Sequence, residues 1–138
     1  MADIAVDMNN GTAYVVCQDG GRTARCKSGW AKSSDHGQTW TQLGVVNTVS
    51  TTDAHTPSVA VDEFGTVAVS YYDYRLNVVN SNDGLETAHW IRRSHDGGAT
   101  FRPDEMLGTP IDTRKAPYAS GYFLGDYDGL ASIGDSGS

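Results

Sequence analysis

The chain has 138 residues and a formal net charge of −7, with 16 glycines and 4 prolines. Its length suits a single domain, and an acidic chain without a basic stripe excludes nucleic acid as the partner. The sequence has no apolar run long enough to span a bilayer, so we expect no membrane partner. The residues after Met1 do not form the apolar core of a signal peptide.

The chain begins with two apolar segments joined by a polar turn that carries Asp7 and Gly11. The same pattern returns later with Asp62 and Gly65 in the turn. Apolar positions that alternate, or run in short blocks bounded by Gly, Asn and Asp, predict strands rather than helices. The two strand–turn–strand segments span residues 4–16 and 58–70.

Two more strands are expected after each of these segments. The expected third strands span residues 28–32 and 87–93, and the expected fourth strands span 40–46 and 101–107. Four antiparallel strands at a period of about 55–60 residues are typical of β-propeller blades. We therefore predict an all-β fold with one blade in residues 1–50, a second in 51–110, and the first strand of a third in 111–138.

An octet of the form S-x-D-x-G-x-T-aromatic separates the third and fourth strands in both halves. Its aspartate can accept hydrogen bonds from backbone N–H groups of its own turn, its glycine supplies an unusual backbone conformation, and its aromatic residue can anchor the turn on the apolar body. These are structural roles. The octet positions are Ser33, Asp35, Gly37, Thr39 and Trp40 in the first copy, and Ser94, Asp96, Gly98, Thr100 and Phe101 in the second.

A blade buries both of its faces only when neighbouring blades stack on it, and a closed ring removes the exposed edges. Two blades and one extra strand leave two sheet faces to be covered. We therefore expect either missing blades or self-association of the chain to close the propeller.

The sequence contains two cysteines, Cys17 at the end of the second expected strand and Cys26 at the start of the third. Opposed residues on neighbouring antiparallel strands lie at distances that a disulfide can bridge. Two free, half-buried thiols are an equally open alternative. A bridge would indicate a secreted protein, whereas two thiols fall short of a zinc site.

Together these segments resemble the sialidase-like, Asp-box (BNR repeat) six-bladed propeller superfamily, and especially bacterial secreted exo-sialidase-like and BNR-repeat glycosyl-hydrolase-like proteins. The resemblance rests on the two octets and on residues 57–62, 69–75 and 121–127. It implies an extracellular, bacterial protein. It also implies that the octets, or Asp boxes, lie on the face opposite the ligand, whose own face is formed by residues 18–25, 47–57, 73–86 and 108–127.

In that family, arginines clamp the carboxylate of an acidic sugar, an aspartate delivers a proton and a tyrosine attacks the sugar. On this basis the candidate catalytic residues are Asp83, Asp73 and Tyr127, and the candidate substrate-binding residues are Arg75, Arg22, Asp126 and Tyr122. Two structural alternatives stay open: Arg75 pairs with Asp73, and Asp83 caps a turn. The Arg-Ile-Pro phrase that opens sialidase domains is absent.

Two function classes follow. The first is an exo-sialidase-type glycoside hydrolase, or a fragment of one, acting on terminal acidic sugars of glycans. The alternative is a non-catalytic propeller module that binds glycans or builds an assembly. Neither requires a cofactor or a metal, since the segment 126–129 has too few oxygen ligands in series for a calcium loop.

Overall fold

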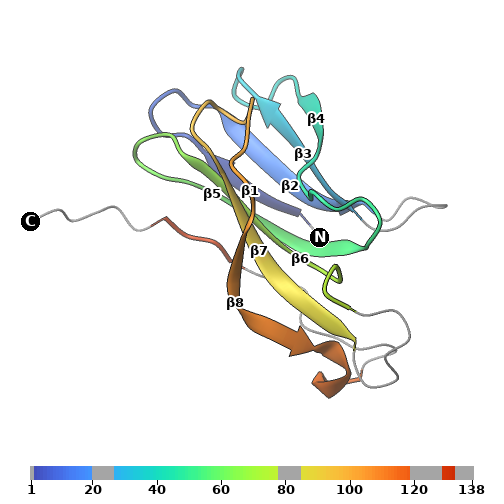
Figure 1. Cartoon of the computed structure of the whole chain (residues 1–138). Helices are drawn as coiled ribbons and strands as arrows, with labels where there is room; N and C mark the ends of the chain where they lie inside the picture. The colour runs from blue at the N-terminus through green and yellow to red at the C-terminus, as the bar shows by residue number, and fades with distance from the viewer. Residues whose placement is uncertain (1, 20–26, 78–84, 119–128, 133–138) are drawn as a thin grey trace, which may run out of the picture.

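The computed structural model describes residues 2–19, 27–77, 85–118 and 129–132. Within these ranges the fold is all-β, with eight strands and one short 3₁₀ helix, as predicted (Figure 1). The elements are β1 (Ala2–Val6), β2 (Ala13–Asp19), β3 (Lys27–Ser33), β4 (Thr41–Val45), β5 (Ala54–Val61), β6 (Val67–Asp73), β7 (Glu86–Ser94), β8 (Glu105–Asp112) and η1 (Thr113–Lys115).

The strands form two four-stranded antiparallel sheets, each with its strands side by side in chain order. The first sheet has the order β1-β2-β3-β4 and the second has the order β5-β6-β7-β8. Tight turns explain this order. Asp7 and Asp62 each accept a hydrogen bond from a backbone N–H two residues later, and the glycines near the ends of the two turns have φ angles of 74° and 79°.

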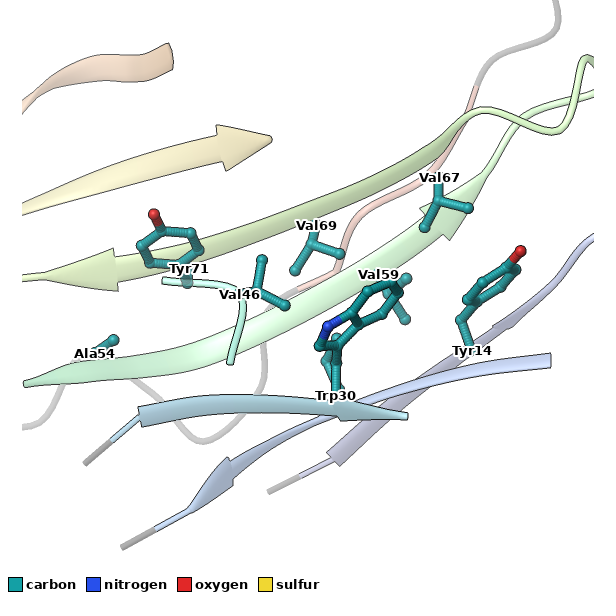
Figure 2. Packing of buried hydrophobic residues seen from close by; sticks show 9 residues of the cluster. Tyr14, Trp30, Val46, Ala54, Val59, Val67, Val69 and Tyr71 are labelled. Atoms are coloured by element: carbon teal, nitrogen blue, oxygen red, sulfur yellow. The ribbon is translucent and has the colours of Figure 1, made fainter. Parts of the chain in front are cut away.

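The two sheets pack through β5, which contacts β1, β2 and β3 of the first sheet. The core lies in this interface, where aromatic side chains of the first sheet face valines of β5 and β6 (Figure 2). The largest members, Tyr14 and Trp30, are 2% and 6% exposed, and Val67 and Val69 are fully buried. Apolar burial across the interface therefore holds the two sheets together.

The first sheet uses only one of its faces in this core. Its other face presents Ile4, Val6 and Val45, which are 58%, 44% and 47% exposed. Alternation along the strands explains the contrast, because successive side chains point to opposite faces of the sheet.

The expected strands are present, but β8 begins at Glu105 rather than at Phe101. Pro103 lacks an N–H for the ladder, and the Asp104 side chain is turned toward Arg75 and Tyr71. Before these residues, the Arg102 N–H still bonds to the Arg93 carbonyl, at 2.8 Å. The backbone just after the octet is therefore still hydrogen-bonded to β7, and the fourth strand starts later than the sequence predicts.

Most of the expected third repeat falls outside the described residues. The part that is described, 129–132, is not a strand, but it runs beside β5. The Leu130 N–H bonds to Ser58 Oγ at 3.1 Å, and Ser132 Oγ bonds to the Val61 carbonyl at 3.0 Å.

Cys17 lies on β2, and the residue opposite it on β3 is Gly29. The expectation that Cys17 and Cys26 are directly opposed is therefore not supported by the register. Cys17 is a free cysteine in the structure, which agrees with the alternative of free thiols. Because Cys26 lies outside the described residues, the bridge itself stays a prediction.

Candidate functional site

The two Asp boxes have the same internal hydrogen bonds. In the first, Asp35 Oδ1 accepts from the Thr39 N–H at 2.8 Å and from Ser33 Oγ at 2.7 Å. In the second, Asp96 Oδ1 accepts from the Thr100 N–H and from the serine at the start of the box at the same two distances. The aspartate therefore organises the turn, as the pattern predicted.

Both carboxylates accept more hydrogen bonds when ionised than they could when protonated. A side-chain bond from Thr39 and the bond from its N–H lower the pKa of Asp35 to about 2. The equivalent bonds from Thr100 lower the pKa of Asp96 to about 2. Each box thus holds a charged carboxylate down to acidic pH.

The second box is packed on the first sheet. Phe101 meets Trp30 edge to face, with the ring centroids 5.1 Å apart. A Cβ added to Gly98 would lie 2.0 Å from the same indole, and one added to Gly97 would lie 3.4 Å from the Tyr14 hydroxyl. Glycine is required at position 98 because the Trp30 ring of the other sheet lies against its backbone, whereas Gly97 leaves room for ordinary contact with Tyr14.

The first box has no such support among the described residues. Its aromatic residue, Trp40, is 43% exposed and donates a hydrogen bond to the Gly37 carbonyl of its own turn. The expectation that this residue anchors the box on the apolar body is wrong for Trp40, whereas it is confirmed for Phe101.

The boxes lie at one end of the sheets, together with the β1–β2 and β5–β6 turns; we call this the box end. The opposite end, where the β2–β3, β4–β5 and β6–β7 connections meet, we call the loop end. The Asn9 side chain donates to the Glu63 carbonyl at 2.9 Å, so the box ends of the two sheets coincide. The family resemblance assigns ligand binding to the loop end.

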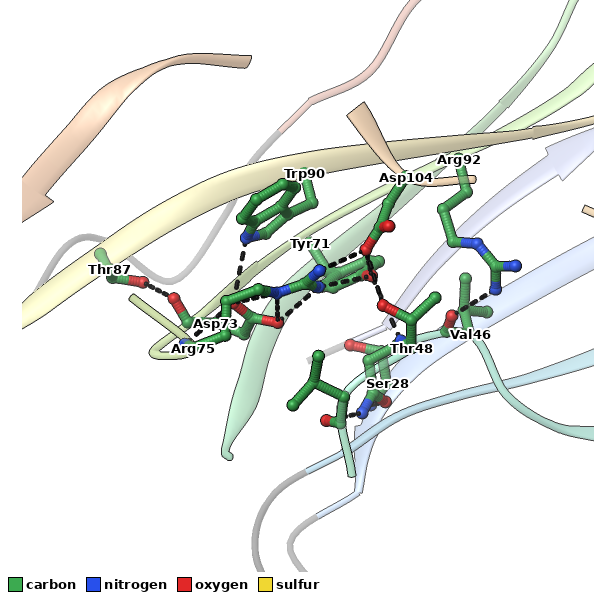
Figure 3. A network of polar contacts seen from close by, with 12 residues as sticks. Ser28, Val46, Thr48, Tyr71, Asp73, Arg75, Thr87, Trp90, Arg92 and Asp104 are labelled. Carbon is green, nitrogen blue, oxygen red and sulfur yellow. Dashed lines mark hydrogen bonds and ion pairs between the residues drawn. The ribbon is translucent and has the colours of Figure 1, made fainter. Parts of the chain in front are cut away.

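Two of the predicted site residues are described, and the structure brings them together. The Arg75 guanidinium binds the Asp73 carboxylate through Nε at 2.8 Å and Nη2 at 2.7 Å (Figure 3). Asp73 is fully buried and also accepts from Trp90 Nε1 at 3.0 Å. This is the pairing that the sequence left open as the structural alternative.

Arg75 also reaches a second carboxylate, which the sequence analysis missed. Its Nη1 lies 2.6 Å from Asp104 Oδ2, its Nη2 donates to the Tyr71 hydroxyl at 3.1 Å, and its guanidinium carbon lies 4.0 Å from the centroid of the Trp90 ring. Burial opposes the charge, but the hydrogen bonds to Asp73 and Asp104 outweigh it and raise the pKa of Arg75. The arginine is thus committed to its own sheet.

The Asp104 carboxylate joins this network to the β4–β5 connection. It accepts from Thr48 Oγ1 at 2.7 Å and from the Tyr71 hydroxyl at 3.0 Å. Burial alone would raise the pKa of Asp104, but its hydrogen bonds, first that from Thr48, lower it. No sequence motif marks Asp104, since its partners Thr48, Tyr71 and Arg75 lie 56, 33 and 29 residues away in the sequence.

A tyrosine paired with a carboxylate is the arrangement that a sialidase nucleophile needs. The pair of Tyr71 and Asp104 has this form, but the Tyr71 side chain is fully buried between the sheets. Burial raises the pKa of the Tyr71 hydroxyl. A buried, protonated phenol cannot attack a sugar, so this pair is structural.

Aromatic side chains gather at the loop end of the second sheet. The rings of His55, Tyr72 and His89 stack across β5, β6 and β7, with centroids 5.6 and 4.2 Å apart, and Tyr74 lies 5.3 Å from His55. Burial lowers the pKa of His55, which keeps the imidazole neutral at neutral pH, and raises the pKa of Tyr74. A hollow beside this cluster is lined by Thr52, Asp53, Tyr74 and Leu85.

The backbone next to this cluster has an unusual conformation. Thr56 has a φ of 50°, at a bulge where the β5–β6 register shifts between His55 and Ser58. A left-handed conformation is a genuine outlier for a β-branched residue. It places the Thr56 hydroxyl 3.1 Å from His55 Nδ1, and its N–H donates to the side chain of Gln18 on the first sheet.

The other described arginine at the loop end is also paired with a carboxylate. Arg114 Nη2 lies 3.2 Å from Asp112 Oδ2, in the 3₁₀ turn that follows β8. The N–H of the intervening Thr113 bonds to the Leu85 carbonyl at 2.9 Å, which joins this turn to the segment before β7.

The remaining predicted site residues lie outside the part of the chain that the structure describes. They are Arg22, Asp83, Tyr122, Asp126 and Tyr127. Within the described ranges, no group of three or more His, Cys, Asp or Glu side chains is placed to hold a metal ion. The same ranges contain no helix of the length and hydropathy that crossing a membrane requires.

No protein-family model matches the chain, and no curated protein matches it.

Proposed function

We propose that the two sheets are consecutive blades of a sialidase-like Asp-box β-propeller. Three observations support this. Both sheets are four-stranded and antiparallel in chain order, both carry an Asp box in the turn between their third and fourth strands, and the first strand of the second sheet packs on the face of the first. This is the packing that a radial repeat of blades needs.

We further propose that this propeller binds a glycan at its loop end, as a non-catalytic module. The single observation that carries this choice is the commitment of Arg75, which is bonded to two carboxylates and a buried tyrosine. An arginine so engaged has no fork free for a sugar carboxylate. The ring cluster around Tyr74 and the hollow beside it supply apolar surface and hydrogen-bonding groups, among them the Asp53 side chain, instead.

The second candidate is an exo-sialidase-type glycoside hydrolase acting on terminal acidic sugars. It is favoured by the position of the β6–β7 connection, which carries Asp83 and starts at the loop end beside Tyr74. This function requires clamp, acid and nucleophile from residues such as Arg22, Asp83 and Tyr127. We propose an extracellular, bacterial setting for either function, as the family resemblance implies; a Cys17–Cys26 bridge would indicate the same setting, but Cys17 is a free cysteine in the structure.

Two assays on the same protein separate the candidates. A glycan-binding module is retained on a glycan array and releases no fluorophore from a fluorogenic sialoside. A hydrolase releases the fluorophore. Tyr74→Ala should then abolish retention on the array, with Tyr118→Ala as the control, because Tyr118 is 74% exposed and is not among the residues that line the hollow. Sialoside turnover by the wild type would contradict the non-catalytic proposal, and turnover that survives Asp83→Asn would contradict the role given to Asp83.

A further inference from the structure

The first sheet exposes an apolar face whose equivalent is buried in the second sheet. Ile4 and Val6 are 58% and 44% exposed. Their counterparts by position in the repeat, Val59 and Val61, are respectively 2% exposed and packed against the core. Because the residues are alike, the difference comes from what covers them.

The second sheet is covered by the face of the first sheet that carries Tyr14 and Trp30. Two contacts determine how the two sheets fit together. The Trp30 indole lies over Gly98, and the Tyr14 hydroxyl lies near Gly97 (Figure 2 shows both rings pointing toward the second sheet). Two adjacent glycines and the small ring of Phe101 make room for two large aromatic side chains.

The first box has the opposite size pattern. His36, with a φ of 60°, stands where the second box has Gly97, and Trp40 stands where it has Phe101. Among the described residues, a Cβ on Gly37 would meet the Trp40 ring alone, at 3.8 Å. A sheet that covers this box therefore needs smaller residues than Tyr14 and Trp30.

The second sheet has those smaller residues on its other face. Ala68 pairs with Arg93 as Tyr14 pairs with Lys32, and Ile91 pairs with Ser70 as Trp30 pairs with Val16. These residues leave a hollow on this face, which is bordered by Ala60, Ala68, Ile91 and Arg93 on one side and by Leu130 and Ser132 on the other. Large residues in the first box thus meet small ones on this face, the reverse of the joint within the chain.

We propose that the exposed face of the first sheet binds the outer face of the second sheet in a second copy of this chain. The contact is head-to-tail and repeats the joint between the two sheets of one chain, with Trp40 and His36 packing against Ala68 and Ile91 on the face that residues 129–132 now cover. A contact between two different faces relates successive copies by a fixed rotation. The copies form a closed ring when repeated rotation returns to the first copy, and an open chain when it does not.

Residues 129–132 compete with the second copy for this face. The Leu130 N–H bonds to Ser58 Oγ at 3.1 Å, as the Val59 N–H bonds to Asp3 Oδ2 at 3.0 Å across the internal joint. Since Ser58 holds the position of Asp3 in the repeat, Leu130 stands where the first strand of an incoming copy must lie. Association therefore requires this segment to leave.

The test is sedimentation equilibrium of the whole chain over a range of concentrations. The wild type should show a mass that rises with concentration. Ile4→Asp, which blocks one face, and Ala68→Glu, which blocks the other, should each stay monomeric, and their equimolar mixture should form a 1:1 dimer and nothing larger. Met106→Asp is the matched control, because Met106 is 45% exposed on neither docking face, and it should associate like the wild type.

Circular dichroism checks that each variant is folded, and Val6→Asp replaces Ile4→Asp if that variant is not. Leu130→Pro removes the N–H that holds the competing segment and should tighten association by up to about tenfold, the scale of one hydrogen bond. A wild type that stays monomeric overturns the proposal and leaves the face to another sheet. A mixture of the two blocked variants that fails to dimerise also overturns it, and an unchanged affinity of Leu130→Pro refutes the competition.

Discussion

The two sheets repeat the same four strands and the same box, yet equivalent positions have different surroundings. Trp40 in the first box is 43% exposed, while Phe101 in the second packs against Trp30. The second sheet also contains the buried network around Arg75, and at the equivalents of Tyr71 and Trp90 the first sheet has Cys17 and Gly29. The comparison shows that the box is a self-contained turn, whereas the anchoring of its aromatic residue depends on whether another sheet packs against it.

The largest effect should come from breaking the network that only the second sheet has. Arg75→Met leaves the fully buried Asp73 without its counter-ion, and removing one partner of a buried ion pair costs roughly 3–5 kcal/mol. Arg93→Met removes an ion pair with Glu105 in which the side chains are 38% and 64% exposed, and should cost about 1 kcal/mol or less. Chemical denaturation with both variants measures the difference. Equal losses would show that the Arg75 network is not buried in solution.

Substitution of the equivalent glycines in the two boxes distinguishes the effect of docking on the other sheet from the effect of turn geometry. Gly37 and Gly98 have φ angles of 84° and 86°, so alanine at either position costs about 1–2 kcal/mol in strain. At Gly98 the new methyl group also meets Trp30, which adds roughly 1–3 kcal/mol of overpacking. Thermal and denaturant unfolding should show that the Gly98→Ala protein is much less stable than the Gly37→Ala protein. The opposite ranking would mean that the second box is not docked.

Acid should weaken both boxes alike. The pKa of Asp35 and of Asp96 lies near 2 in the folded protein, below the value of 3.8 for an unconstrained aspartate. A lowered folded pKa stabilises the fold above the unfolded value, and this contribution is lost as pH falls from about 4 toward 2. Carboxyl ¹³C shifts recorded against pH measure the two values directly. Two aspartates titrating near 4 would contradict the role of these hydrogen bonds.

The smallest effect is expected at the one position where the boxes differ in backbone preference. His36 has a φ of 60° where the second box has Gly97. His36→Gly should relieve this strain but enlarge the entropy of the unfolded chain, so the net gain in stability should be about 1 kcal/mol or less. Gly97→Ala is the reverse change and should destabilise. A destabilised His36→Gly protein would instead show that the entropy gained by the unfolded chain outweighs the strain.

Local sequence predicted the elements of this fold well, because their signals are short. The turns of Asp7 and Asp62, the alternating strands and the boxes depend on residues within a few positions of one another. The late start of β8 was not predicted, because Asp104 is held by Arg75 and Thr48, which lie 29 and 56 residues away. Tyr71 and Trp90 were not predicted either, because Tyr71 donates to Asp104, 33 residues away, and Trp90 donates to Asp73, 17 residues away.

The sequence by itself determined the all-β character, the two four-stranded repeats and the internal bonds of both boxes, since each depends on side chains that bond or pack within one turn or one hairpin. Only the tertiary structure decided that Phe101 is anchored while Trp40 is exposed, because that depends on whether another sheet supplies a Trp30. It also placed Arg75 against Asp73 and Asp104. A guanidinium turns to the carboxylates that folding brings within reach, and Asp104 becomes one of them only when β8 is placed beside β7.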